Sequence, residues 1–287
     1  MTIRNPIEWT ADRVGLGDSA GRARPPYVAS PGAAETPRPI IVRKIDLHNL
    51  REALSKGFED FGANRTDVVF LCLFYPLFGL VVVRIASGSE MLPLLFPMAS
   101  GFALLGPLAG VGLCEMSRRR EQGLESGWSA AFSVTRSPAF GSVLALGLIL
   151  FMIYAVWLLI ALGIYAVTLG PQPPVSVGAF LHDVLTTPAG WTMTIVGIGL
   201  GFMFACVVLV LTNVSFPLLL DRNVGVGRAI ATSVQAARVN PGPIAAWGLI
   251  VAIGLLAGSI PLFFGLVLVL PVLGHATWHL YRKLVTE

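Results

Sequence analysis

The sequence predicts an all-α fold, a polytopic membrane bundle of six transmembrane helices. We expect the helices to form three hairpins, each preceded by a cytoplasmic amphipathic helix. Long runs at residues 139–181, 184–220 and 239–278 contain no Asp, Glu, Lys or Arg, whereas a helix in a water-soluble protein needs a polar face. The chain is also 55% hydrophobic and only 13% charged, against roughly 25% charged in soluble domains. Both observations place the helices in a membrane.

The six expected spans follow the apolar runs, and roughly 20 helical residues suffice to cross the core of a bilayer. They are placed at residues 66–86, 91–114, 139–169, 191–220, 243–258 and 260–281. The third and fourth spans are longer than a crossing requires and should tilt or project beyond the membrane. Gly258, Ser259 and Pro261 favour a turn between the last two spans.

The N-terminal segment has a different composition. It holds five prolines between residues 25 and 39, among Gly, Ala and Arg, and it lacks the apolar core of a signal peptide. Such a segment cannot bury enough apolar surface to become ordered. We therefore expect residues 1–44 to be a disordered cytoplasmic tail and residues 45–287 to be the membrane domain.

Lysine and arginine predict the orientation, because cytoplasmic loops carry an excess of these residues. They cluster before the first span, after the second and fourth spans, and at the C-terminal end, whereas the loops on the other side contain only Arg84. Both termini are therefore expected in the cytoplasm, and the longest outside loop covers about residues 170–190. The net charge of +4 is explained by these segments, so no nucleic-acid partner is expected.

Similar segments predict a threefold internal repeat, with units at about residues 45–118, 119–221 and 222–287. Segments ahead of the first and fifth spans share residues at equal offsets: Ala53, Gly57 and Asn64 in one, and Ala229, Ser233 and Asn240 in the other. The ends of the even-numbered spans match at Glu115, Asp221 and His279. The unit is an amphipathic helix followed by a two-span hairpin.

The first amphipathic helix carries the clearest start signal. Asp46 is a natural N-cap, and Ile45 with Leu50 has the spacing of a hydrophobic staple. Apolar residues follow at helical spacing: Leu47, Leu50, Leu54, Phe58 and Phe61. Such a helix either lies in the membrane interface or packs beneath the spans.

Two segments carry a resemblance to a known family. Residues 274–282 read Gly-His-Ala-Thr-Trp-His-Leu-Tyr-Arg, and residues 42–45 read Val-Arg-Lys-Ile. They resemble segments of a bacterial family of predicted integral membrane proteins, domain of unknown function 2189, over about residues 40–287. The resemblance implies a multi-pass protein of the bacterial cytoplasmic (inner) membrane without an established activity. Some members are labelled as cytochrome c oxidase subunits.

His275 and His279 are the residues on which that label depends. They are four residues apart and share one face of a helix, so they could bind haem iron or another metal. The catalytic core of a haem–copper oxidase needs more histidines than the four in this chain, which excludes that role. The alternative is an interfacial belt formed by His275, Trp278, His279 and Tyr281 at the cytoplasmic end of the last span.

Two other polar features are candidate sites. Asn213 is the most polar point well inside a span, where it either bonds to a neighbouring helix or lines a cavity. Arg118, Arg119 and Arg120 orient the chain and could bind anionic lipid headgroups. The sequence shows no nucleotide-binding loop or metalloprotease motif.

These observations predict a non-enzymatic membrane protein without a catalytic site or a cofactor. Its spans are expected to pack against lipid, a partner complex or a second copy of the chain. Two alternatives remain open. One is a permease for a small molecule or lipid at the repeat interface, and the other is an oxidase-associated or haem-binding accessory subunit that uses His275 and His279.

Overall fold

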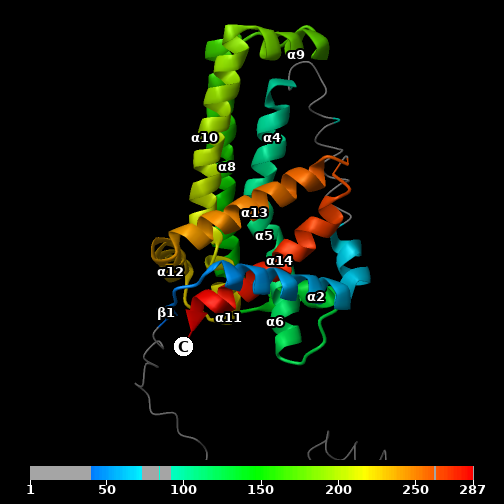
Figure 1. Ribbon diagram of the computed structural model, residues 1–287, viewed down its shortest axis with the longest axis vertical. Helices are drawn as coiled ribbons and strands as arrows, with labels where there is room; N and C mark the ends of the chain where they lie inside the picture. The colour runs from blue at the N-terminus through cyan, green and yellow to red at the C-terminus, as the bar shows by residue number, and fades with distance from the viewer. Residues whose placement is uncertain (1–39, 73–83, 85–91, 262, 287) are drawn as a thin grey trace, which may run out of the picture. The chain divides into compact units, whose positions relative to one another are not determined.

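Helices make up most of the computed structural model, which describes residues 40–72, 84, 92–261 and 263–286 (Figure 1). The all-α prediction is confirmed. Four helical segments are long and apolar enough to cross a membrane: Leu92–Glu121, Phe140–Thr168, Pro188–Asp221 and Pro241–Ser259. They match the second to fifth predicted spans and support an integral membrane protein with several apolar helices.

The first and sixth predicted spans are not among these four segments. Most of the first, residues 66–86, lies outside the described residues. At the place of the sixth lies α14 (Leu266–Leu284), which is not one of the four apolar segments. The C-terminal part of α14 contains His275, His279 and two basic residues in the last turn. These polar residues make α14 less apolar than the other segments.

Two of the apolar segments are interrupted. Residues 92–121 comprise η1 (Leu92–Leu94), α4 (Leu95–Phe102), η2 (Ala103–Leu105), α5 (Gly106–Ala109) and α6 (Val111–Glu121). Residues 188–221 comprise α10 (Pro188–Thr212) and α11 (Ser215–Asp221). Two segments are continuous helices, α8 (Phe140–Thr168) and α13 (Pro241–Ser259). Proline contributes to the interruptions, because it has no N–H to donate within a helix.

A serine from another helix bridges the break between α10 and α11. In a continuous helix, the Val214 N–H would donate to the Val210 carbonyl. Here Val214 N donates to Ser233 Oγ over 3.1 Å, and Ser233 Oγ donates to the Val210 carbonyl over 2.7 Å. Ser233 is fully buried and lies on α12 (Val226–Val239). The inserted hydroxyl satisfies the opened backbone groups and joins α12 to the break.

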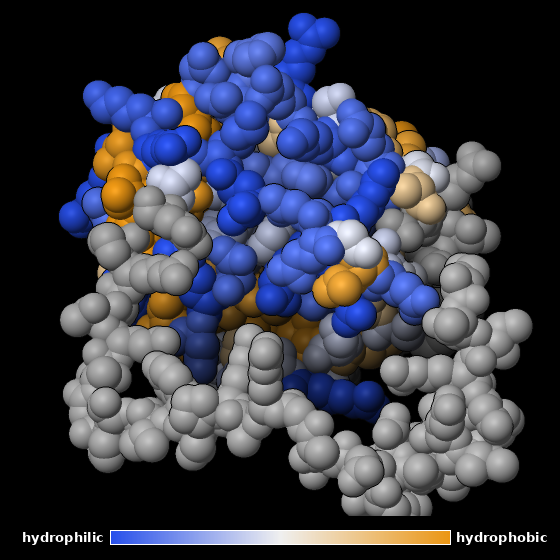
Figure 2. All heavy atoms as spheres, turned by 90° about the horizontal axis from the view of Figure 1, so that it is seen from below, coloured by the Kyte–Doolittle hydropathy of each residue, from blue (hydrophilic) through white to orange (hydrophobic). Residues whose placement is uncertain are grey.

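The two ends of the folded chain lie side by side. Strand β1 (Ile41–Val42) pairs antiparallel with β2 (Val285–Thr286), ahead of the predicted domain boundary at residue 45. The Asn240 side chain extends this connection, since it accepts from Ile45 N over 2.8 Å and donates to the Arg43 carbonyl over 2.9 Å. Figure 2 shows that hydrophilic side chains gather on this end of the molecule.

The predicted amphipathic segments are helical, and each packs against the end of another helical segment. Helix α2 (Leu47–Cys72) packs along α14, α12 packs against α11, and α7 (Trp128–Phe132) packs against α6. Asp46 caps α2 as predicted, because its carboxylate accepts from Asn49 N over 3.0 Å. Leu50 and Ala53 are buried, whereas Leu47 and Phe58 stay exposed. The buried face is therefore narrower than the predicted apolar face.

Gly57 allows α2 and α14 to approach closely. A Cβ atom at this position would lie 2.7 Å from the Val272 carbonyl oxygen and 2.8 Å from Ala276 Cβ. Both separations are shorter than van der Waals contact, and the first involves backbone. A residue larger than glycine would therefore push the two helices apart.

Replacing Gly57 by alanine should destabilise the protein by about 1–3 kcal/mol, the usual cost of overpacking. The effect is measured by thermal unfolding in detergent, with size-exclusion chromatography to detect the folded protein that remains after heating. Gly62→Ala is the matched control, because it lies on the same helix with nothing within 4 Å of its added Cβ, and alanine favours helix formation. Equal melting temperatures for both variants would contradict this packing of α2 on α14.

Candidate functional site: a buried polar cluster

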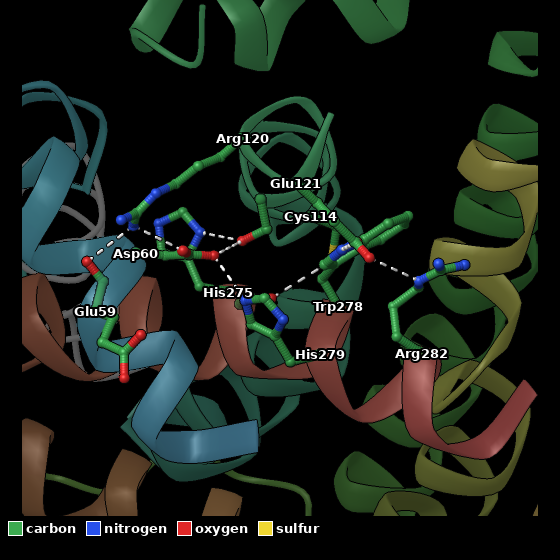
Figure 3. A network of polar contacts seen from close by, with 11 residues as sticks. Glu59, Asp60, Cys114, Arg120, Glu121, His275, Trp278, His279 and Arg282 are labelled. Carbon is green, nitrogen blue, oxygen red and sulfur yellow. Dashed lines mark hydrogen bonds and ion pairs between the residues drawn. The ribbon is translucent and has the colours of Figure 1, made fainter. Parts of the chain in front are cut away.

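A cluster of polar side chains lies between α2, α6 and α14 at the hydrophilic end (Figure 3). We call it the polar cluster, and its members are Asp60, Ser117, Arg120, His275 and His279. Each helix contributes for a sequence reason. Asp60 follows Ala53 and Gly57 at helical spacing on the buried face of α2. His275 and His279 are one turn apart on α14, and Ser117 lies near the end of α6.

The Asp60 carboxylate is the centre of the polar cluster. Its Oδ2 accepts from Ser117 Oγ over 2.6 Å and lies 2.8 Å from His279 Nε2. Its Oδ1 accepts from Arg120 Nη1 over 2.8 Å. Burial alone would raise the pKa of Asp60, but the hydrogen bonds from His279 and Ser117 outweigh burial and lower it. The carboxylate is therefore ionised at neutral pH.

The hydrogen bonds determine which nitrogen of His275 carries its proton. His275 Nδ1 lies 2.8 Å from Ser117 Oγ. Because Ser117 gives its only proton to the Asp60 carboxylate, His275 Nδ1 must carry a proton and donate it to Ser117. Burial lowers the pKa of His275 to about 4, against the opposing charge of Asp60. The ring is therefore neutral at neutral pH, and its Nε2 atom is buried.

Further polar contacts join α14 to the surrounding helices. Trp278 Nε1 donates to Glu121 of α6 over 2.8 Å, and Arg282 Nε donates to the same carboxylate over 3.1 Å. The Tyr281 hydroxyl donates to Asp221 of α11 over 2.6 Å. Burial and the bond to Asp221 raise the pKa of Tyr281, so the phenol keeps the proton that it donates. Together these contacts hold α14 against both α6 and α11.

The predicted pair His275 and His279 is thus connected through Ser117 and Asp60. The interfacial-belt alternative does not fit, because His275, Trp278 and Tyr281 are buried. Among the described residues, no group of three or more His, Cys, Asp or Glu side chains is arranged to hold a metal ion. We did not predict Asp60 or Ser117. The spacing of Asp60 from Ala53 and Gly57 is a signal that could have identified it.

The other predicted site residues, Asn213 and the arginines at positions 118–120, do not form a common site. Asn213 lies at the break between α10 and α11, buried, and its side-chain nitrogen and oxygen have no partner among the described residues. Arg118 pairs with Glu115 over 2.9 Å, and Arg119 Nε donates to the Glu125 carbonyl over 2.9 Å. Arg120 belongs to the polar cluster. All three guanidinium groups are thus engaged within the chain.

Comparison with known proteins supports the membrane assignment. Residues 95–221 match the sequence model of the family described as "predicted integral membrane protein (DUF2189)". The predicted family resemblance is confirmed. The DUF2189 match contains α6, α8, α10 and α11, whereas the segments at residues 42–45 and 274–282, on which the prediction was based, lie outside it. No curated protein and no solved structure matches the chain.

The pKa of His275 predicts that acid destabilises the fold. The pKa of His275 in the folded chain, about 4, lies below the 6.5 of a histidine exposed to water. The contribution of His275 is therefore complete above pH 6.5 and is lost as the pH falls toward 4, because the unfolded chain then binds a proton that the folded chain excludes. The loss should reach about 1.4 kcal/mol per pH unit and about 3 kcal/mol in total.

Urea unfolding in detergent at several pH values measures this dependence. His275→Asn keeps an amide donor near the position of Nδ1 and removes the titrating group, so stability should change less between pH 6.5 and pH 4. His182→Gln, at an exposed histidine, is the control and should retain the dependence of the original chain. An unchanged dependence in the His275→Asn variant would show that another group is responsible.

Proposed function

We propose that this is a non-enzymatic integral membrane protein that packs within a membrane-protein complex. The polar cluster would act as an internal brace. The observation that carries the proposal is the closure of the polar cluster, where Asp60, Ser117 and His275 are only 6%, 1% and 0% exposed. Their contacts are to side chains of the same protein, so a substrate would have to separate three packed helices to reach them.

The partner surface that we propose lies on α10. Only three of its 25 residues, Gly190, Val208 and Thr212, are buried. Ile195, Ile198 and Phe202 form an apolar stripe at helical spacing and are 66%, 56% and 69% exposed. Gly199 lies on the same face, with open space at its Cβ position. A small residue within an apolar face suits close approach of a second membrane helix.

We further propose the bacterial cytoplasmic membrane, with both termini in the cytoplasm, as the location. The pairing of β1 with β2 supports a common side for residues 41–42 and 285–286, and the hydrophilic surface at that end suits the cytoplasmic face (Figure 2).

The threefold repeat is also proposed. Its support is the cyclic order in which each amphipathic helix packs on the end of another unit, α2 on α14, α7 on α6 and α12 on α11. Equivalent positions also make equivalent contacts, since Gly57 faces Val272 and Ser233 bonds to Val214.

Copurification from native membranes tests the complex. A green fluorescent protein is fused to the C-terminus and should fluoresce in cells, because it folds in the cytoplasm. Purification of this fusion in mild detergent should also recover a membrane partner in a fixed ratio. Ile198→Trp should reduce recovery severalfold, since added bulk disrupts a packed interface but is tolerated by lipid. Leu148→Trp, at an exposed residue of α8, is the control. Repeated recovery of the chain alone would reject the complex, and a dark fusion would reject the orientation.

Asn213 favours a second candidate, a permease for a small neutral molecule. Its amide can both donate and accept hydrogen bonds, it is unpaired within the described residues, and it lies where the apolar segment is interrupted. Interrupted membrane helices form substrate sites in some transporters.

Glycerol entry into proteoliposomes, followed by light scattering, tests the permease candidate. Entry should be faster than in protein-free vesicles, and Asn213→Leu should reduce the excess rate severalfold because it removes the polar group and keeps the branched shape of the side chain. Asn223→Leu, at an exposed asparagine beyond the end of α11, is the control and should leave the rate unchanged. A rate equal to that of empty vesicles would count against glycerol permeation.

A further inference from the structure

Helix α9 (Val177–Thr186) lies at the end of the molecule opposite to the polar cluster, crosswise to α8 and α10 (Figure 1). It forms part of the outside loop predicted at residues 170–190. Ser176 caps it by accepting from Ala179 N over 3.1 Å. None of its ten residues is buried. A short helix without buried residues gains little from packing within its own chain, so its place in the fold requires another explanation.

The corner between α9 and α10 is fixed by hydrogen bonds. Thr187 Oγ1 donates to the Asp183 carbonyl over 2.6 Å and accepts from Gly190 N over 3.0 Å, so one side chain ends α9 and caps α10. Trp191 Nε1 donates back to the Leu185 carbonyl over 3.0 Å. A Cβ atom at Gly190 would lie 2.1 Å from the Asp183 carbonyl oxygen. The corner therefore depends on glycine and holds α9 crosswise.

Helix α9 is also held against α8. The Phe180 ring lies 6.4 Å from the Tyr165 ring between centroids, and the Tyr165 hydroxyl donates to the Gln172 carbonyl over 2.5 Å. Phe180 and Val184 are half-buried, and they are the most enclosed residues of the helix. These contacts turn one side of α9 toward the apolar spans.

An exposed apolar stripe runs along α9, next to the face that carries Phe180 and Val184. Val177, Leu181 and Leu185 are 50%, 50% and 63% exposed and lie four residues apart, within one face of the helix. His182 and Ala179 lie on other faces. Exposed apolar residues of the spans, among them Val167 of α8 and Trp191 of α10, lie close to α9 and continue the apolar surface. The stripe thus extends the surface by which the spans face lipid.

We propose that α9 is an interfacial helix, whose stripe of Val177, Leu181 and Leu185 inserts into the lipid leaflet opposite to the polar cluster. The occupant of the stripe is phospholipid, at the boundary between headgroups and acyl chains, where amphipathic helices lie in the membrane plane. Lipid fits because the stripe is continuous with the exposed surface of the spans. The rigid corner holds the helix crosswise, as this position requires.

Spin-label accessibility in liposomes tests the proposal on the full chain. Cys72, Cys114 and Cys206 are replaced by alanine, and single labels are introduced by Leu181→Cys or by the matched change Ala179→Cys on the opposite face. The vesicles contain phosphatidylcholine and phosphatidylglycerol. Collisions with oxygen, which concentrates in lipid, should exceed those with a water-soluble nickel chelate at position 181. At position 179 the order should be reversed, with ratios that differ severalfold.

The same measurement separates lipid from other occupants. Dilution of the protein tenfold in lipid should leave the label at position 181 unchanged if lipid covers the stripe. Equal nickel accessibility at both positions would overturn the proposal by placing the stripe in water. A label at position 181 that is immobile and shielded from both reagents would also overturn it, and release upon dilution would then identify a second copy of the chain as the occupant.

Discussion

The buried carboxylate of Asp60 is the constraint on which the architecture of the hydrophilic end depends. An ionised carboxylate away from water is costly unless hydrogen bonds and opposite charges surround it. Asp60 obtains them from Ser117 and Arg120 on α6 and from His279 on α14. Because Asp60 lies on α2 and its partners lie on α6 and α14, no one of these helices can move without leaving the buried carboxylate short of a hydrogen bond. The polar cluster thus specifies how these helices associate, whether or not it adds much net stability.

The same requirement explains the polar residues at the helix breaks. Ser233 bonds to the backbone groups that open between α10 and α11, and Asn240 bonds to the backbone at Arg43 and Ile45. Each serves a backbone group far from it in sequence, since an unpaired backbone group in an apolar interior is costly. The proposed repeat has residues of different size at equivalent positions. Gly57 permits the close contact between α2 and α14, whereas the Ser233 hydroxyl fills the break between α10 and α11.

Local and compositional features of this chain were predictable, whereas its long-range polar contacts were not. Charge-free runs mark three of the four apolar segments because burial in lipid depends on composition, and the Asp46 cap depends on residues within one turn. The contact between Asp60 and Ser117 joins positions 57 residues apart, and spacing along one helix cannot reveal it. His275 and His279 share a face by spacing alone, but their different bonds arise from two other helices.

The two ends of the protein are stabilised by different kinds of contact. At the polar cluster, ionised Asp60, Arg120 and neutral His275 determine the fit, so protonation changes its free energy. At the α9 corner, Thr187 and Trp191 donate to backbone carbonyls, and these neutral bonds do not titrate near neutral pH. The fit there is governed by the space at Gly190. Acid can therefore weaken the packing of α2 and α14 at the polar cluster. The hydrogen bonds that hold α9 crosswise to α10 should persist under the same conditions.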